Sequence, residues 1–101
     1  MAYEWDRDKA NSNIKKHGIY FEEAQTVFES DFNSITLSDL DHSFGEERYI
    51  EIGISHNGRL LAIVYVERET DIRIISARKA TPREAKLYDQ GQSSPPNLCF
   101  E

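Results

Sequence analysis

Hydrophobic residues recur at helical spacing in the first thirty positions of the chain. Asp6 is a favourable N-cap residue and Gly18 a favourable C′ residue, so we expect a helix over about residues 7–17, with a thin apolar stripe. A second helix is expected to begin near Phe21, where Phe21, Ala24, Val27 and Phe28 share one face. Tyr20, which precedes this helix, is a poor N-cap residue.

From Phe32 onward the pattern changes to that of β-strands. Apolar and polar residues alternate in "RYIEIGISH", which is typical of a half-buried strand, whereas "RLLAIVYVERE" is almost continuously apolar and suits the centre of a sheet. Asn57–Gly58, between these two segments, is a strong hairpin signal. We therefore expect four strands, over about residues 32–37, 48–56, 59–69 and 70–79, and a polar loop over 38–47.

A third helix is expected after the last strand. Thr81 is an N-cap residue, Pro82 occupies the first helical position, and Glu84 follows three residues after the cap, so the three form a capping box. Gly91 is expected to end this helix. The segment "GQSSPPNLCFE" contains two adjacent prolines and is expected to be a flexible tail.

These elements predict an α+β fold, in which two N-terminal helices pack on a four-stranded antiparallel sheet and a short helix follows at the C-terminus. The short links between consecutive strands favour an antiparallel arrangement. A chain of 101 residues is long enough to bury one hydrophobic core. We expect a single domain over residues 1–90 and a tail over 91–101.

Charge is distributed unevenly along the chain, whose formal net charge is −6. Residues 1–47 contain 11 acidic and 4 basic residues, a net charge of −7, and residues 48–101 contain 7 acidic and 8 basic residues, a net charge of +1. An anionic ligand would therefore be attracted more strongly to the C-terminal half. The acidic total disfavours non-specific binding to nucleic acid.

The composition also bounds the cellular compartment. Cys99 is the single cysteine, so it cannot form an internal disulfide, which fits a reducing cytoplasm. No apolar run approaches the ~20 residues of a membrane span, and the N-terminus lacks the features of a secretory signal. His17, His42 and His56 are not at zinc-binding spacing. We expect a cytoplasmic protein without a membrane, metal or cofactor partner.

The stretch "RIISARKATPREAKLY" gathers cations in this acidic chain. Strict alternation along its strand places Arg73, Ile75, Ala77 and Lys79 on one face, and Ile72, Ile74, Ser76 and Arg78 on the other. An arginine at the end of an apolar row needs an ion pair or an anion. The guanidinium of Arg78 suits phosphate oxygens, and the nearby helix start at Thr81 offers free N–H groups. The simpler alternative is an ion pair with Glu84 or with a carboxylate on a neighbouring strand.

Four further cations have two interpretations each. Arg68 and Arg73 flank a turn, where they either contact an anion or are solvated. Lys79 and Arg83 either extend an anion site or belong to a solvated helix face.

Two other residues could carry chemistry. His17 ends the first helix, where it could act as an acid or base near neutral pH or could merely interact with the helix dipole. Tyr88 could anchor the core through its ring or present its hydroxyl to a site.

Four stretches together extend this picture, namely "WDRDKANSNIKKHGIYFEEAQTVF", "DHSFGEERY", "GRLLAIVYVERE" and "RIISARKATPREAKLYD". In this order they resemble the BrnT toxin family over about residues 5–89. The most specific parts are the N-x-x-K-H-G-x-x-F-x-E-A block and the R-I-I-S-A-R-x-A block. The resemblance implies a RelE-like fold and a type II toxin that cleaves RNA as an endoribonuclease and inhibits translation. It also implies a BrnA-like antitoxin with a ribbon-helix-helix DNA-binding domain, through which the complex would repress its own operon.

Metal-free RNA cleavage needs a base for the 2′-hydroxyl, cations for the crowded phosphorane and an acid for the leaving 5′-oxygen. Attack by the 2′-hydroxyl would make the enzyme specific for RNA. By resemblance, the expected catalytic residues are Arg78, Arg68, His17 and Tyr88. RNA-phosphate contacts are expected from Arg73, Lys79 and Arg83.

Two alternatives to an active enzyme stay open. A catalytically degenerate toxin could serve solely as antitoxin partner and co-repressor, and the acidic N-terminal half suits such a protein-binding surface. A third possibility is a small domain that binds another anionic ligand at the strand end marked by Arg78.

Overall fold

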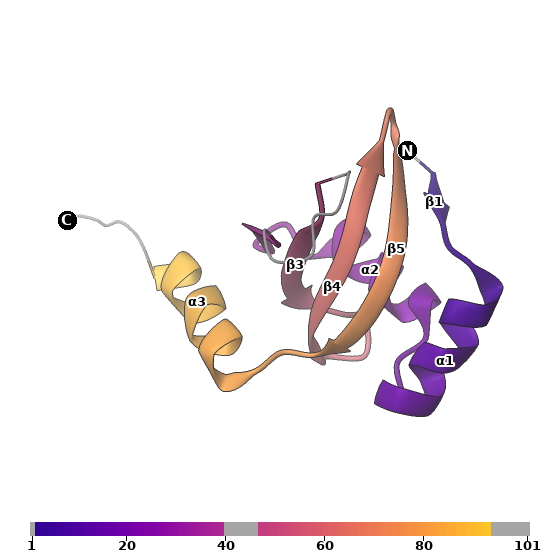
Figure 1. The fold of residues 1–101 in the computed structure, drawn as a ribbon. Coiled ribbons are helices and arrows are strands. Elements are labelled where there is room, and N and C mark those ends of the chain that lie inside the picture. The colour runs from indigo at the N-terminus through magenta and orange to yellow at the C-terminus, as the bar shows by residue number, and fades with distance from the viewer. Residues whose placement is uncertain (1, 40–46, 94–101) are drawn as a thin grey trace.

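The computed structural model of the chain describes residues 2–39 and 47–93. Within these ranges the chain forms five strands and three helices, with α1 beside one edge of the sheet and α3 at the other side (Figure 1). In chain order the elements are β1 (Tyr3–Glu4), α1 (Arg7–His17), α2 (Phe21–Ser30), β2 (Ile35–Ser38), β3 (Tyr49–Ile54), β4 (Leu60–Arg68), β5 (Asp71–Lys79) and α3 (Pro82–Ser93). His42, Cys99, most of the predicted polar loop and most of the predicted tail lie outside the described residues.

The sheet is five-stranded and mixed, in the order β1-β5-β4-β3-β2. The predicted α+β class is confirmed, but the predicted four-stranded antiparallel sheet is wrong. Tyr3 and Glu4 pair in parallel with Ile72 and Arg73, and the N–H of Ile72 donates to the carbonyl of Ala2 at 2.9 Å. A strand of two residues shows no period in a sequence, so nothing in the hydrophobic pattern marked it.

Of the four capping signals in the sequence, three placed a helix end correctly. The carboxylate of Asp6 accepts from the N–H of Lys9 at 3.0 Å, and Gly18 closes α1 at a φ of 70°. In α3 the Thr81 hydroxyl accepts from the N–H of Glu84 at 3.1 Å, and the Glu84 carboxylate accepts from the N–H of Thr81 at 2.9 Å. The predicted capping box is therefore present.

The prediction that Gly91 ends the last helix is wrong, because α3 continues to Ser93. A Cβ atom added at Gly91 would lie 3.2 Å from Cγ2 of Ile35, a tight contact. This glycine therefore allows α3 to pass close to β2.

A β-bulge in β5 changes which side chains share a face. Val64 pairs with Ser76 and Tyr65 with Ile74, so Ile75 is an extra residue in the ladder. The predicted strict alternation is therefore wrong beyond Ile74. Ile72, Ile74 and Ala77 face α2, whereas Arg73, Ser76 and Arg78 point to the opposite side, which we call the outer face.

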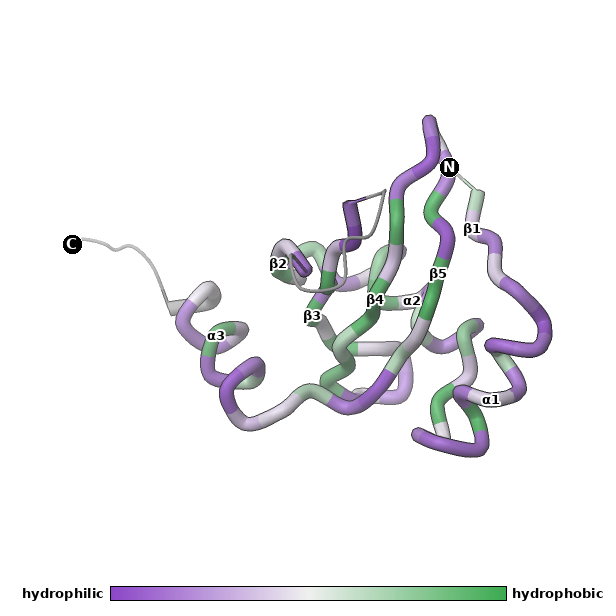
Figure 2. Tube along the Cα trace, viewed as in Figure 1, coloured by the Kyte–Doolittle hydropathy of each residue, from purple (hydrophilic) through white to green (hydrophobic). Residues whose placement is uncertain are grey.

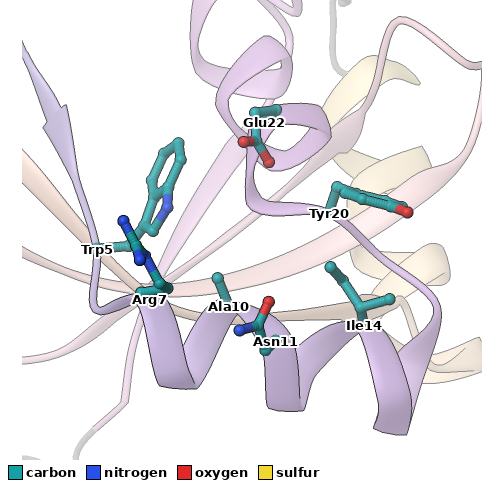
Figure 3. Close-up of a pocket in the computed structure, with 7 residues that line it drawn as sticks. All are labelled: Trp5, Arg7, Ala10, Asn11, Ile14, Tyr20 and Glu22. Carbon is teal, nitrogen blue, oxygen red and sulfur yellow. The ribbon is translucent and has the colours of Figure 1, made fainter.

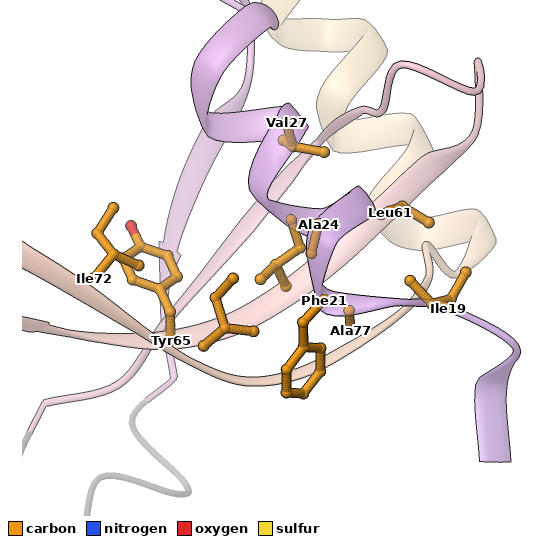
Figure 4. Packing of buried hydrophobic residues seen from close by; sticks show 10 residues of the cluster. Ile19, Phe21, Ala24, Val27, Leu61, Tyr65, Ile72 and Ala77 are labelled. Carbon is orange, nitrogen blue, oxygen red and sulfur yellow. The ribbon is translucent and has the colours of Figure 1, made fainter. Parts of the chain in front are cut away.

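The main core lies between α2 and the sheet. Ile19, Phe21 and Val27 pack with Leu61 and Ala77, all fully buried (Figure 4). Aromatic rings extend this core toward the N-terminus, since Trp5 meets Phe21 edge-on at 5.8 Å between ring centroids. In Figure 2 the hydrophobic colour follows the middle of β4 and β5, and the tip between these strands is hydrophilic.

The helix α3 covers part of the outer face. Tyr88 is buried against Ile52 and Ala62, and Ile35 and Leu60 pack at the edge of this second cluster. The remainder of the outer face, toward the β5 bulge, is left without a helix over it among the described residues.

An ion pair joins α2 to the turn between β3 and β4. Arg59 donates through Nε to Glu23 at 2.9 Å, and Ser55 donates to the same carboxylate at 2.6 Å. The hydrogen bond from Arg59 lowers the pKa of Glu23 from 4.5 to about 2, although burial opposes the shift. The charged form of Glu23 thus stabilises the folded state.

We expect the free energy of unfolding to fall as the pH drops from about 4.5 toward about 2. In that range the unfolded chain binds a proton at Glu23 that the folded chain does not, so acid favours unfolding. Urea unfolding of Glu23→Gln at several pH values should show a shallower slope than the wild type. Glu22→Gln, an exposed neighbour, should keep the wild-type slope. Equal slopes in all three proteins would contradict this role of Glu23.

Candidate functional site

Two adjoining hollows meet at the β5 bulge, and both are bordered by Ile75 and Ser76. Each has a volume of about 260 Å³. We call the two together the bulge groove. Its lining also includes Lys9, Ser12, Asn13, Lys16 and His17 from α1, and Asp39, Arg48, Ile50, Val64 and Arg78 from the sheet and its approaches.

One wall of the bulge groove is a face of α1. Lys9, Asn13 and Lys16 are spaced by four and three residues, so they project from the same side of the helix. Asn13 fixes this side against β5, because its amide donates to the carbonyl of Ala77 at 2.8 Å and its oxygen accepts from the N–H of Ala77 at 3.0 Å. The same amide also donates to the carbonyl of Ile19 at 2.9 Å.

The other wall comes from the outer face of the sheet. Arg48 precedes β3 and lies two residues before Ile50, and Arg78 lies opposite Ala62 on the neighbouring strand. Four permanent cations, one imidazole and one carboxylate therefore border the groove: Lys9, Lys16, Arg48, Arg78, His17 and Asp39. Positive charge thus exceeds negative charge along this border although the chain is acidic, which favours an anionic ligand.

Arg78 is held by a bidentate ion pair. Its Nη1 and Nη2 donate to the two carboxylate oxygens of Glu84 at 2.6 and 2.9 Å. The pairing raises the pKa of Arg78 and lowers the pKa of Glu84. The side chain of Arg78 keeps 30% of its surface exposed, against 13% for Glu84. The predicted alternative of an Arg78–Glu84 pair is therefore present, and Arg78 still borders the groove.

A third hollow of about 570 Å³ continues from the bulge groove under the start of α3. It shares Asp39 and Ile50 with the bulge groove. Leu37 and Leu87 give it an apolar wall, and Arg83 stands at its rim. We call it the α3 hollow. Together these depressions form a track across the outer face from α1 to α3.

Arg68 is far from Arg78 along the sheet. Arg78 lies opposite Ala62, and Arg68 ends the same strand. With a rise of about 3.3 Å per residue, the two arginines are separated by about 20 Å along β4. Arg68 ends β4, and this strand ends at the top of Figure 1, whereas β5 ends at the bottom. The structure does not bring these two predicted residues together.

The remaining predicted residues are distributed around the sheet. Arg73 shares the outer face with Arg78 and lies 3.7 Å from the carboxylate of Glu4. Lys79 is exposed at the end of β5 and pairs with Leu61, so it points to the side opposite Arg78.

Tyr88 borders none of these depressions. Its ring is buried in the second cluster, and its hydroxyl donates to Asp31 at 2.8 Å. Burial and then Asp31 raise the pKa of Tyr88 to about 12. Of its two predicted roles, the structure supports that of an anchor for α3.

Sequence reasoning missed three cations of the groove. Arg48 could have been found by alternation, because it shares a face with Ile50 and Ile52. Lys9 and Lys16 could have been found by their helical spacing around Asn13. Their place beside the β5 bulge depended on the contact between Asn13 and Ala77, which no local pattern reveals.

A separate hollow of about 540 Å³ lies between α1 and the start of α2. Trp5, Ile14 and Tyr20 give it apolar walls, and Arg7 and Glu22 stand beside them (Figure 3). Tyr20 exposes 57% of its surface and provides no capping hydrogen bond to α2. We call this depression the α1–α2 hollow.

Residues 5–84 match a protein family described as "Ribonuclease toxin, BrnT, of type II toxin-antitoxin system". The chain belongs to the BrnT family. A BrnT toxin therefore has a protein antitoxin as its partner, as the type II system implies. No curated protein matches the chain.

The fold of this BrnT chain is similar to the 1.1 Å crystal structure of the Brucella abortus ribonuclease toxin BrnT. The TM-score is 0.62 and the sequence identity 24%, with 80% of this chain and 99% of the other chain covered. At this identity the likeness concerns the fold alone. The family match ends at Glu84, so it includes the bulge groove but most of α3 lies beyond it.

In residues 2–39 and 47–93, no three His, Cys, Asp or Glu side chains gather closely enough to hold a metal ion. No helix in these ranges is long and apolar enough to cross a membrane. The bulge groove offers cations and an imidazole around a shallow floor, a set that can bind a phosphodiester and move a proton.

We expect Asn13→Ala to lower the free energy of unfolding by about 2–4 kcal/mol, because it leaves buried backbone groups of Ala77 and Ile19 without partners. Asn11→Ala, at an exposed position of the same helix, should change it by less than about 0.5 kcal/mol. Urea unfolding of both variants tests this. Similar stabilities for the two variants would show that Asn13 does not fix α1 to β5.

Proposed function

We propose that this protein is a metal-independent endoribonuclease toxin that cleaves RNA by 2′-hydroxyl attack and thereby inhibits translation. The observation that carries the proposal is the bulge groove of this acidic protein, where Lys9, Lys16 and His17 border one half and Arg48 and Arg78 border the other. Membership of the BrnT ribonuclease toxin family supports it.

In the proposed reaction, the scissile phosphate lies over Ile75 and Ser76, the residues shared by the two halves of the groove. Arg78 and Arg48 stabilise the charge that develops on the phosphorane oxygens. His17 is the proposed proton donor or acceptor, since it borders the same groove from α1. The 2′-hydroxyl supplies the nucleophile, so DNA is not cleaved.

The other predicted residues take outer positions in this proposal. Arg73 and Arg68 contact RNA phosphates along the outer face toward the β4–β5 tip, and Arg83 contacts them at the α3 hollow. Lys79 adds positive charge at the end of β5. Contacts of this kind add affinity and salt dependence rather than rate.

We further propose that the antitoxin is a BrnA-like protein with a ribbon-helix-helix domain, and that the complex represses its own operon through that domain. The acidic N-terminal half, with a net charge of −7 over residues 1–47, is complementary to a basic partner. The toxin itself would contact operator DNA solely through the antitoxin.

The second candidate function is a catalytically degenerate toxin that acts as antitoxin partner and co-repressor. The α1–α2 hollow favours it, because Tyr20 is exposed there although a small polar residue would cap α2 better. A residue that departs from a local sequence preference, such as the N-cap preference, without a gain in stability often has a functional role. This function requires binding to the antitoxin and no RNA cleavage.

We expect purified wild-type protein to cleave single-stranded RNA and leave 2′,3′-cyclic phosphate and 5′-hydroxyl ends. Arg78→Ala should slow cleavage by about 10²–10³-fold, as loss of one charge-stabilising donor does in other enzymes. Arg68→Ala, about 20 Å away, should slow it less than about fivefold. Gel analysis of labelled RNA, with determination of the end groups, measures cleavage by the wild type and both variants. Expression in cells should arrest growth most strongly for the wild type, less for Arg68→Ala and least for Arg78→Ala.

Two results would contradict the enzyme. Wild-type protein that leaves RNA intact but binds the antitoxin would establish the second function instead. Equal losses for Arg68→Ala and Arg78→Ala would mean that the reaction is not centred on the bulge groove.

A further inference from the structure

We propose that Glu84 and Tyr88 are positioning residues, which fix the guanidinium of Arg78 in the bulge groove without touching RNA. This inference rests on the proposed ribonuclease function and adds a set of residues to it. It assigns a catalytic purpose to α3, a helix that mostly lies beyond the segment matched by the family.

The Glu84 carboxylate holds Arg78 from a fixed place. One of its oxygens accepts from Nη1 of Arg78 at 2.6 Å and from the backbone N–H of Thr81 at 2.9 Å, and the other accepts from Nη2 at 2.9 Å. A carboxylate tied to the first turn of its own helix cannot swing with the arginine. It therefore defines the plane of the guanidinium.

The pair leaves Arg78 able to bind phosphate. The hydrogen bonds to Glu84 use Nη1 and Nη2, and the Nε–H edge has no acceptor among the described residues. A guanidinium carries five N–H groups, so a second anion can bind at a free edge while Glu84 holds the first. The carboxylates of Glu84 and Asp39 both act on Arg78, and Arg48, Lys9 and Lys16 add positive charge elsewhere along the groove.

Tyr88 helps to fix the position of Glu84, because the two residues are one turn apart in α3. Its hydroxyl donates to Asp31 at 2.8 Å. Asp31 is itself fixed, because it accepts from the backbone N–H groups of Ile54 at 2.7 Å and Asn33 at 3.0 Å. Asp31, in the link between α2 and β2, thus fixes α3 through Tyr88. The helix in turn keeps Glu84 in contact with Arg78.

The decisive test is rescue of Arg78→Ala by free guanidinium ion. Guanidinium should bind beside the intact Glu84 carboxylate and restore RNA cleavage by about tenfold or more over the variant alone. In the double variant Arg78→Ala/Glu84→Gln, the same ion should restore less than about twofold. A purely structural role for Glu84 would not make rescue depend on its charge.

The single variants give a second readout. Glu84→Gln should lower kcat by about tenfold and change KM by less than about twofold, because misplacement of a catalytic group slows the reaction more than it weakens binding. Tyr88→Phe should lower kcat by about two- to fivefold in the same manner. Glu67→Gln, the same change at an exposed carboxylate of β4, should behave as wild type. Circular dichroism confirms that each variant is folded.

These experiments distinguish a failure of the positioning role of Glu84 and Tyr88 from a failure of the proposed ribonuclease function. If wild-type protein cleaves RNA and Glu84→Gln is equally fast or faster, Glu84 does not position Arg78. Rescue that is equal in the single and double variants, or absent from both, also overturns the inference. If wild-type protein neither cleaves RNA nor binds a 2′-O-methyl oligonucleotide, the proposed function fails and the inference fails with it.

Discussion

The amide of Asn13 is the interaction on which the arrangement of the site depends. β1 pairs with β5 at Ile72 and Arg73. Beyond these residues, the backbone N–H and C=O groups on the same edge of β5 need other hydrogen-bond partners. Asn13 supplies them by bonding both the N–H and the carbonyl of Ala77. A side chain thus replaces a strand, and a helix rather than a strand borders β5 there. This is how Lys16 and His17 come to lie beside Ser76.

The bulge at Ile75 is the second constraint. Without the extra residue, Arg73 and Arg78 would point to opposite faces, because five residues separate them along β5. The bulge restores both arginines to the outer face and leaves Ala77 facing the core. Bulges often redirect side chains beside functional sites, and here the redirected residues include the arginine paired with Glu84.

Much of the fold followed from local signals. The caps at Asp6 and Thr81 and the alternation in β3 are properties of short segments, and they were readable in the sequence. The strand β1 and the bulge were not, since both exist through pairing between distant segments. The same division applies to the site. His17 and Arg78 stand in recognisable blocks, whereas the distance between Arg68 and Arg78 required the register of the sheet. The place of Lys9 and Lys16 in the groove required the contact between Asn13 and Ala77.

The separation in sequence between Asn13 and Ala77 also bears on when the groove forms. Asn13 on one wall of the bulge groove and Ala77 in β5 are 64 positions apart in the chain. Contacts between such distant segments form late, because a long loop must close first. During synthesis the groove cannot assemble before the ribosome has reached Arg78 of 101 residues. The cations of α1 are therefore synthesised long before β5, and the groove that they border cannot yet exist at that stage.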